Sequence, residues 1–379
     1  MALIPSEQDF SSPLRGPEVA SRVGLWLGIC FGIAFLTGVF SHFYQDRPDW
    51  LWLPARPVWI YQVTQGLHVI AGTAAVPLLL VKLWSVFPKL FARIPLQNMG
   101  KAAVHLAERA SIAALVSASI FLLATGVANI THWYPWEFSF RDSHYAVAWI
   151  AIGAMLVHIA VKLPLIRDAF ARDTGGPPPA GSGLTRRGLI RTALVASGAV
   201  VLTTAGSTVP WLRQVSVFGV RSGDGPQGIP INKSAKSAKV VARALAPSYA
   251  LTVTDGAASR TLTRADLEAL PQHDAELPIA CVEGWSASGV WGGVRLQDVV
   301  ALLTEPAGTT VTVLSLQETG AFRSSQVLPD LVVDPLTLLA LRLNGENLSI
   351  DHGYPCRLIA PGRPGVLQTK WVSRIEVAT

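Results

Sequence analysis

The 379-residue sequence has few cysteines and few charged side chains. Its three cysteines, Cys30, Cys281 and Cys356, stand too far apart for a CxxC motif or zinc-finger spacing, and they exclude a disulfide framework. Charged residues make up 15% of the chain and apolar residues 50%, a balance that excludes an ordinary soluble enzyme along its whole length. Because the basic residues flank apolar segments, the net charge of +6 does not indicate nucleic-acid binding.

Five apolar segments without a charged residue follow one another in the first part of the chain. A helix needs about 20 apolar residues to cross the bilayer, and each segment approaches or reaches that length. We therefore predict an all-α membrane bundle of five transmembrane helices. No signal peptide precedes the first segment, so we expect it to stay in the mature protein. The five segments are 23–40, 58–81, 110–130, 145–161 and 192–212.

The basic residues predict which way these helices cross the membrane. The segments before the first span, after the second and after the fourth hold thirteen Lys and Arg residues, whereas the other two loops hold three. Because basic loops stay in the cytoplasm, the N-terminus is expected inside. Five crossings then place everything after Arg213 on the extracytoplasmic, periplasmic side of a bacterial cytoplasmic membrane.

A linker rich in Gly, Pro and Ser, 173–183, precedes the fifth apolar segment. Arg186 and Arg187 follow it and resemble a twin-arginine export signal, although they equally suit the role of positive-inside anchors. The two interpretations are compatible. We predict three parts: a four-span domain at 1–172, the linker and fifth span at 173–213, and an outer domain at 214–379.

The histidines of the apolar part are candidates for haem ligation. His144 and His158 are fourteen residues apart, so both leave one face of a helix, about 21 Å apart along its axis. One helix can thus ligate two stacked haems, with His68 as the second ligand of the outer iron and His105 of the inner one. His132 is the rival of His144. The alternative is that one haem or none binds, and that the interfacial histidines are ordinary: His42, His105, His132 and His144.

Residues 20–170 resemble the cytochrome b subunits of membrane formate dehydrogenases and hydrogenases. The resemblance rests on His68 and the two histidines of the fourth span. It implies that the chain binds two b-type haems and exchanges electrons with a membrane quinone. In that family, the first span supplies one ligand of the inner haem. The first span of this chain has no histidine at its cytoplasmic end. An internal repeat suggests that the third span replaces the first: Leu36-Thr37-Gly38-Val39 and Ala124-Thr125-Gly126-Val127.

From Tyr249 onward, short strand and helix patterns alternate and predict an α+β domain. Thr263 and Asp266 have the spacing of a capping box at a helix start. The predicted strands are 249–254, 277–282 and 310–316, and the predicted later helices are 296–303 and 336–343.

Cys281 ends an apolar run and is followed by a Glu-Gly-Trp-Ser turn. A thiol held at a strand end by a glycine turn can offer its thiolate to a soft metal. Two other interpretations stay open at this point. Cys281 can be a buried structural cysteine, or it can pair with Cys356 in a disulfide.

The surrounding motifs resemble the sulfite oxidase family, from about Tyr249 to Thr379. The segment Cys281-Val282-Glu283-Gly284-Trp285-Ser286 resembles the molybdenum–cysteine segment of that family. Further motifs follow in the right order: Trp291-Gly292-Gly293-Val294, Leu338 to Glu346, Asp351 to Gly362, and Lys370-Trp371-Val372. The resemblance implies a mixed sheet packed with short helices, which binds molybdenum through one molybdopterin.

The resemblance also implies roles for individual residues. Cys281 is the expected thiolate on molybdenum, and Arg323 the residue facing an anionic or dipolar substrate, although a solvated surface arginine is an equal alternative. His352, Arg357 and Lys370 are expected to hold the pterin, since the fork of an arginine suits phosphate. Further cofactor contacts are expected from Asn232, Tyr249 and Gln368.

Together these features predict a membrane-bound molybdenum oxidoreductase. It would move electrons between a small extracytoplasmic substrate, sulfite-like or sulfoxide-like, and the quinone pool through b-type haems. The alternative is a non-enzymatic cytochrome b subunit for electron transfer or anchoring, whose outer domain binds no pterin and docks a partner.

Overall fold

A computed structural model describes residues 6–10, 12, 14–48, 50–91, 99–174, 183–219 and 225–378. The chain divides into two compact units. The first comprises Met1–Val39, Leu67–Ala205 and Val215–Phe218, and the second comprises Phe40–Gly66, Gly206–Gln214 and Gly219–Thr379.

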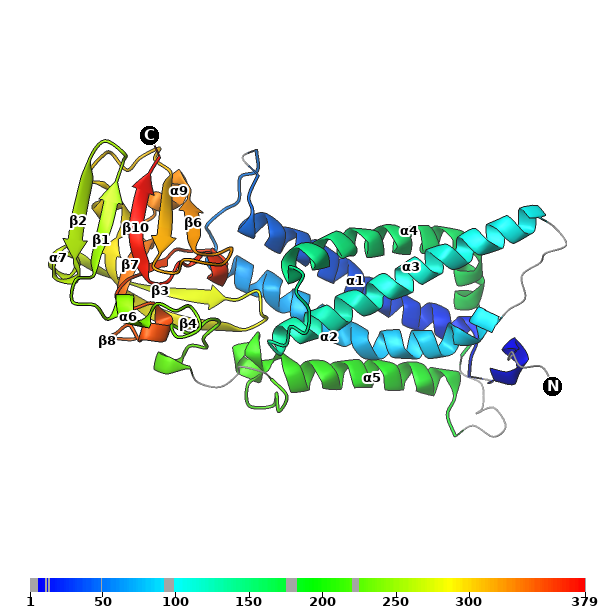
Figure 1. Cartoon of the computed structure of the whole chain (residues 1–379). Helices are drawn as coiled ribbons and strands as arrows, with labels where there is room; N and C mark the ends of the chain where they lie inside the picture. The colour runs from blue at the N-terminus through cyan, green and yellow to red at the C-terminus, as the bar shows by residue number, and fades with distance from the viewer. Residues whose placement is uncertain are drawn as a thin grey trace. The chain divides into compact units, whose positions relative to one another are not determined.

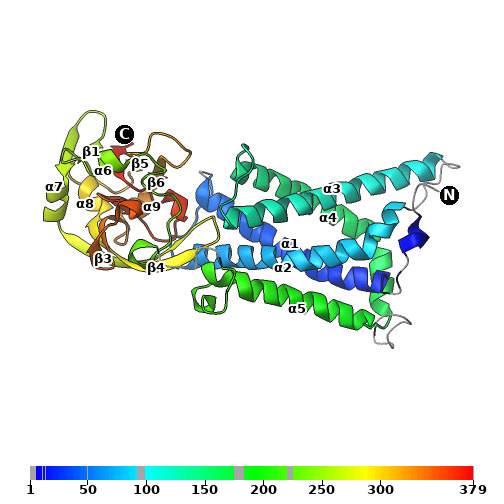
Figure 2. The ribbon, with the colours of Figure 1, turned by 60° about the horizontal axis from the view of Figure 1, so that its bottom comes forward.

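The first unit is helical, and its long helices run side by side in both views (Figures 1 and 2). Five helices in the described part of the chain are long and apolar enough to cross a membrane, as the sequence predicted. They are α1 (Pro17–Gln45), α2 (Ile60–Val86), α3 (Met99–Ile130), α4 (Phe140–Ala171) and α5 (Arg186–Thr204). Short 3-10 helices flank them: η1 (Glu7–Phe10), η2 (Phe87–Phe91) and η3 (Ala205–Ser207).

Small residues let the helices approach one another. Ala118 and Leu122 of α3 pack with Ala151 of α4 in one buried cluster. Val19 and Val23 of α1 form another cluster with side chains of α2 and α5. The small members of these clusters are Ala118, Ala151 and Ala193, and small contact residues are expected in a bilayer, where helix association depends on close packing rather than on a hydrophobic effect.

The second unit contains two five-stranded sheets with short helices. One sheet has the order β2-β1-β10-β5-β6, and in the other β3-β4-β7-β8 follow one another while β9 also pairs with β7. The strands are β1 (Ala250–Thr254), β2 (Ser259–Thr263), β3 (Gln272–Ala280), β4 (Ser286–Arg295), β5 (Val311–Ser315), β6 (Ser324–Val327), β7 (Leu338–Leu343), β8 (Glu346–Asn347), β9 (Arg357–Ile359) and β10 (Val372–Val377). The helices are η4 (Pro210–Leu212), η5 (Pro226–Gly228), α6 (Val241–Ala244), α7 (Arg264–Ala269), α8 (Leu296–Val300), α9 (Pro329–Val332), η6 (Ile350–His352) and η7 (Gly365–Leu367).

The prediction of a helix at 336–343 is wrong, because this segment forms the strand β7. Leu339 and Leu341 pack into the core that the two sheets share, whereas Leu338 and Leu343 pack into a second core on the opposite face. A strand buried on both faces lacks the alternation of apolar and polar residues, so its apolar run resembles a buried helix.

Other local predictions are confirmed. The Thr263 hydroxyl accepts a hydrogen bond from the Asp266 backbone N–H, and the Asp266 carboxylate accepts one from the Thr263 backbone, which completes the capping box of α7. The predicted strands correspond to β1, β3 and β5, and the helix predicted at 296–303 corresponds to α8.

Candidate functional site

Cys281 lies at the end of a β-hairpin. It directly follows β3, which pairs with β4 up to the partners Ala280 and Ser286. The Cys281 N–H donates to the Trp285 carbonyl at 2.9 Å, and the Gly284 N–H donates to the Cys281 carbonyl at 3.0 Å. Gly284 has φ +83°, a left-handed conformation that favours glycine. The Glu-Gly-Trp turn therefore fixes the backbone from which the thiol projects.

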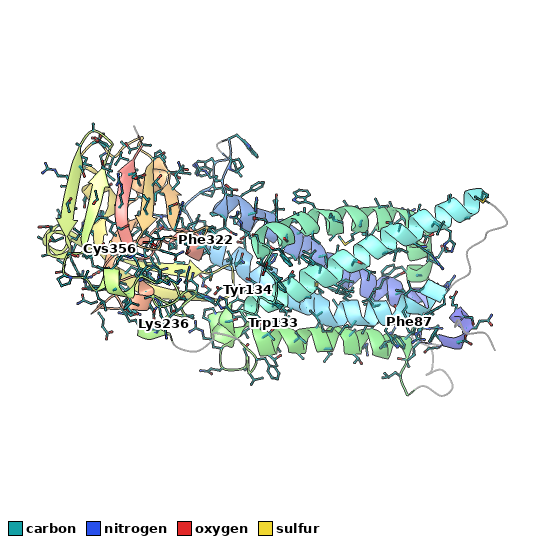
Figure 3. The ribbon with its side chains drawn as sticks, in the orientation of Figure 1. Phe87, Trp133, Tyr134, Lys236, Phe322 and Cys356 are labelled. Carbon is teal, nitrogen blue, oxygen red and sulfur yellow. The ribbon has the colours of Figure 1, made fainter. Side chains whose placement is uncertain are left out.

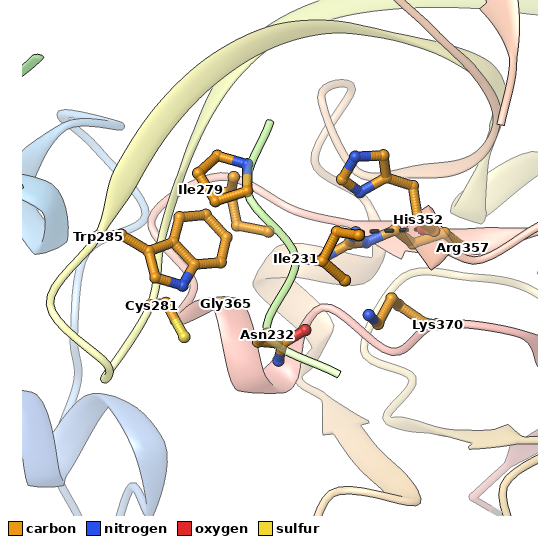
Figure 4. Close-up of a pocket in the computed structure, with 10 residues that line it drawn as sticks. Ile231, Asn232, Ile279, Cys281, Trp285, His352, Arg357, Gly365 and Lys370 are labelled. Carbon is orange, nitrogen blue, oxygen red and sulfur yellow. Dashed lines mark hydrogen bonds between the residues drawn. The ribbon is translucent and has the colours of Figure 1, made fainter. Parts of the chain in front are cut away.

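The Cys281 side chain lines a cavity, together with side chains from segments far apart in the sequence. Figure 4 shows Cys281 and Trp285 at one side of this cavity, and His352, Arg357 and Lys370 at the other. The full lining is Pro230, Ile231, Asn232, Ile279, Cys281, Trp285, His352, Arg357, Gly365 and Lys370.

Backbone carbonyls hold the basic side chains of this cavity in place. The His352 Nε2–H donates to the Pro226 carbonyl at 2.6 Å, and Arg357 Nη1 donates to the His352 carbonyl at 3.1 Å. The Lys370 ammonium donates to the carbonyls of Lys233 and Asp351, at 2.5 and 2.9 Å. Each side chain is thus fixed before any ligand binds.

Gly353 allows these side chains to come together. It has φ +114°, and a Cβ at this position would lie 3.1 Å from the Arg357 Cβ and 3.2 Å from Lys370. Any other residue would be strained in the backbone and would press on both basic residues.

Burial controls the charge of the site. Desolvation, assisted by the positive charge of Arg357, lowers the pKa of His352 to about 4, so this imidazole is neutral at neutral pH. Burial lowers the pKa of Arg357 to about 9, which leaves the guanidinium charged. Burial, followed by repulsion from Arg357, holds the pKa of Lys370 well below its ordinary value. The cavity therefore favours an anionic ligand.

The donor set fits a pterin cofactor that carries a phosphate and sulfur ligands. The buried Arg357 Nε has no hydrogen-bond partner among the described residues, so it requires an acceptor that a ligand would bring. Arginine and lysine donors suit phosphate oxygens, and the Cys281 side chain in the same cavity can ligate a soft metal.

The other predicted residues lie in different places. Asn232 lines the cavity. The buried Gln368 amide bonds to both the N–H and the carbonyl of Ala360, so it shapes the adjoining loop. The Tyr249 hydroxyl donates to the Val372 carbonyl at 2.5 Å, and burial raises its pKa well above the ordinary value. Arg323 is exposed and donates to the Glu318 carbonyl, so its substrate role stays a prediction.

Sequence reasoning missed several lining residues. Pro230, Ile231 and Ile279 carry no chemical signal, because apolar side chains form most of any core. Gly365 offered a weak signal in its Pro-Gly pair. A Cβ there would lie 3.0 Å from the Ala280 carbonyl, so only glycine lets this loop approach the Cys281 hairpin.

No disulfide forms among the three cysteines. Cys356, labelled in Figure 3, is buried in the core between the two sheets, where desolvation raises the pKa of its thiol to about 12. It is therefore an inert core residue, as the sequence suggested.

The predicted haem-ligating histidines lie in the helical unit. The rings of His68 on α2 and His144 on α4 face each other with centroids 6.3 Å apart and planes inclined by 60°. His68 Nδ1 lies 2.9 Å from the Ala34 carbonyl, and His144 Nδ1 lies 3.2 Å from the Thr125 hydroxyl. His132, the rival of His144, instead has its ring next to that of Tyr134.

The internal repeat supplies the surroundings of both rings. Thr37 Oγ1 lies 3.2 Å from His68 Nδ1, as Thr125 does from His144. Cβ atoms at Gly38 and Gly126 would lie 3.1 and 3.8 Å from the Cε1 atoms of His68 and His144. Helices α1 and α3 thus present the same Thr-Gly pair to equivalent imidazoles.

The predicted inner histidines lie near an ion pair. Glu108 on α3 pairs with Lys162 on α4 and interacts electrostatically with both His105 and His158. The buried His105 Nδ1 has no hydrogen-bond partner in the described part of the chain.

Comparison with known proteins identifies the C-terminal region. Residues 238–379 match the family described as oxidoreductase molybdopterin binding domain. The mitochondrial sulfite oxidase of Drosophila melanogaster is 32% identical over 155 residues, which cover 34% of this chain and 27% of that protein. The sulfite oxidase of Arabidopsis thaliana is 29% identical over 164 residues, or 34% of this chain and 42% of that protein.

The chain thus covers less than half of the length of these curated relatives. A structural similarity to the sulfane dehydrogenase SoxCD from Paracoccus pantotrophus has 22% identity and a TM-score of 0.32, covering 41% of this chain and 43% of that one. The matched region is a molybdopterin-binding domain of the kind found in molybdopterin-dependent oxidoreductases of the sulfite oxidase family.

Proposed function

We propose that the chain is a membrane-bound molybdenum oxidoreductase that moves electrons between a small extracytoplasmic substrate and the quinone pool through b-type haem. The substrate is sulfite-like or sulfoxide-like. One observation carries the molybdenum part: the Cys281 side chain enters a cavity whose opposite side holds the buried His352, Arg357 and Lys370.

Bound molybdenum would supply a centre that exchanges an oxygen atom or two electrons with the substrate. The residues of this chain bind and orient it. Cys281 would hold the metal, while Arg357 and Lys370 would hold the pterin and its phosphate. Because its pKa is about 4, His352 is neutral, and its one N–H already donates to the Pro226 carbonyl. It would therefore act on the cofactor site by positioning Arg357 through its backbone carbonyl rather than by donating to the cofactor.

The pair of His68 and His144 supports the haem part of the proposal. Two imidazoles on opposite sides of one iron, each bonded at roughly 2 Å, place their ring centroids roughly 6 Å apart. The observed separation is 6.3 Å. Each Nδ1 already faces a carbonyl or hydroxyl oxygen, which leaves Nε2 for the metal, as is usual for ligating histidines.

The proposed arrangement keeps the domains that the sequence indicates: a four-span cytochrome at 1–172, a linker and fifth span at 173–213, and an outer domain at 214–379. The excess of basic residues on one set of loops supports a cytoplasmic N-terminus. With five helices able to cross the membrane, the outer domain would then lie on the extracytoplasmic side.

Metal analysis of the purified chain tests this proposal. We expect about one molybdenum per chain and b-type haem absorbance. Cys281→Ser should purify with less molybdenum but keep haem, and His68→Gln should lose haem but keep molybdenum. Cys30→Ser, in α1, is the control and should keep both. Haem iron without molybdenum in the wild type would contradict the enzyme and favour an electron-transfer or anchoring subunit.

A further inference from the structure

Helices α1 and α2 make the same contact twice, fourteen residues apart. At the first level, His68 Nδ1 lies 2.9 Å from the Ala34 carbonyl, and a Cβ on Gly38 would lie 3.1 Å from His68. At the second, the Lys82 ammonium lies 2.7 Å from the Ala20 carbonyl. A Cβ on Gly24 would lie 3.1 Å from that ammonium nitrogen.

The second level is therefore a copy of the first, shifted along both helices. Fourteen residues correspond to nearly four turns, or about 21 Å, so side chains at both levels leave the same helix face. Lys82 occupies at the inner level the position that His68 occupies at the outer level.

Helix α4 repeats with the same spacing. His144 faces His68, and His158 lies fourteen residues further along the same helix face. His158 is partly buried, and the charges of Lys82, Lys162 and Glu108 all act on it, so these groups lie in its neighbourhood. By this spacing, the amine of Lys82 and the imidazole of His158 take, at the inner level, the places that His68 and His144 have at the outer level.

This difference changes what the inner level can bind. His68 uses Nδ1 for its carbonyl contact and keeps Nε2 for iron. Lys82 has a single nitrogen, which already donates to the Ala20 carbonyl, so its ammonium offers only further N–H donors. Such a group binds an oxygen acceptor and cannot ligate iron while it is charged.

We propose that the inner level binds the head group of a quinone between Lys82 and His158, in place of a second haem. The two oxygens on opposite edges of a quinone ring would accept hydrogen bonds from the ammonium and the imidazole. The inference rests on the proposed function, because it gives the quinone partner of that function a site. It replaces the pairing of His105 with His158 around a second iron.

The test compares Lys82→Met with Lys89→Met in the full-length, haem-loaded chain. Lys89 lies in η2, just after α2, with a side chain that is 75% exposed and paired with Glu7. Haem reduction is followed by absorbance after adding a short-chain quinol, either the benzoquinol or the naphthoquinol, whichever reduces the wild type. Dithionite, added in a separate experiment, reduces the haem without a quinone site.

Lys82→Met should slow haem reduction by the quinol about tenfold or more, since it removes a charge-assisted hydrogen bond. Reduction by dithionite and haem content should stay unchanged, and Lys89→Met should behave as the wild type. The inference would be overturned if Lys82→Met left the rate of haem reduction by the quinol unchanged. It would also be overturned if dithionite reduced the wild-type haem and neither quinol did. Either result would leave the haem proposal intact.

His158→Gln separates the quinone from a second haem. We expect the wild type to hold one haem per chain and His158→Gln to hold the same amount, with slowed quinol reduction. Two haems in the wild type, one of them lost in His158→Gln, would overturn the inference. A wild type without haem would instead contradict the proposed function itself.

Discussion

At the scale of single residues, His352 makes the stability of the C-terminal domain depend on pH. Its pKa is about 4 in the folded chain, against an ordinary value near 6.5. Below pH 6.5 the unfolded state binds a proton that the folded state does not bind. The contribution of His352 to the free energy of unfolding is therefore complete above pH 6.5 and is lost as the pH falls.

We expect the free energy of unfolding to fall by roughly 1.4 kcal/mol per pH unit between pH 6.5 and about 4 from this group alone. Thermal unfolding at a series of pH values measures the effect. His352→Gln should flatten the slope in this window, whereas His273→Gln, at a partly exposed histidine, should preserve it. Equal slopes in the wild type and His352→Gln would contradict the assignment.

Gly353 provides a test of how tightly the basic side chains are held. Gly353→Ala should lower both the thermal midpoint and molybdenum retention, because it adds backbone strain and a contact against Lys370. Gly308→Ala is the matched control: it has φ +77° but open space around the added Cβ, so it carries only the strain, of about 1–2 kcal/mol. If both variants retained molybdenum equally, the packing argument at Gly353 would be wrong.

At the scale of elements, the Thr-Gly pairs on α1 and α3 are expected to orient the two imidazoles. Thr125→Val should keep the helix but remove the hydroxyl next to His144 Nδ1, and partners of this kind affect metal affinity by about 10- to 100-fold. Haem content and the electron paramagnetic resonance spectrum report the change. Thr131→Val, at a hydroxyl that donates to the backbone carbonyls of Val127 and Ala128, should match the wild type in both measurements.

The elements also show how far the sequence can predict the structure. The five apolar helices, the capping box at Thr263 and the placement of Cys281 at a strand end follow from local patterns. Strand β7 does not, because its burial on both faces depends on two cores built from distant segments. The contact of Lys82 with Ala20 is likewise set by helix packing, so the sequence alone did not indicate it.

At the scale of the whole molecule, the proposed topology requires that a folded domain reach the extracytoplasmic side. Arg186 and Arg187 begin α5, after the Gly, Pro and Ser linker. Replacing both with lysine keeps the positive charge but should leave the outer domain in the cytoplasm, as protease protection in spheroplasts would show. Arg191→Lys is the control, and correct export of the double variant would refute the twin-arginine interpretation.

The account depends most on a bond between the sulfur of Cys281 and a pterin-held molybdenum. X-ray absorption at the molybdenum edge tests it directly, by comparing the wild type with Cys281→Ser reconstituted under the same conditions. The account predicts three sulfur neighbours in the wild type, two from the pterin and one from Cys281, and two in the variant. The same number of sulfur neighbours in both proteins would contradict it.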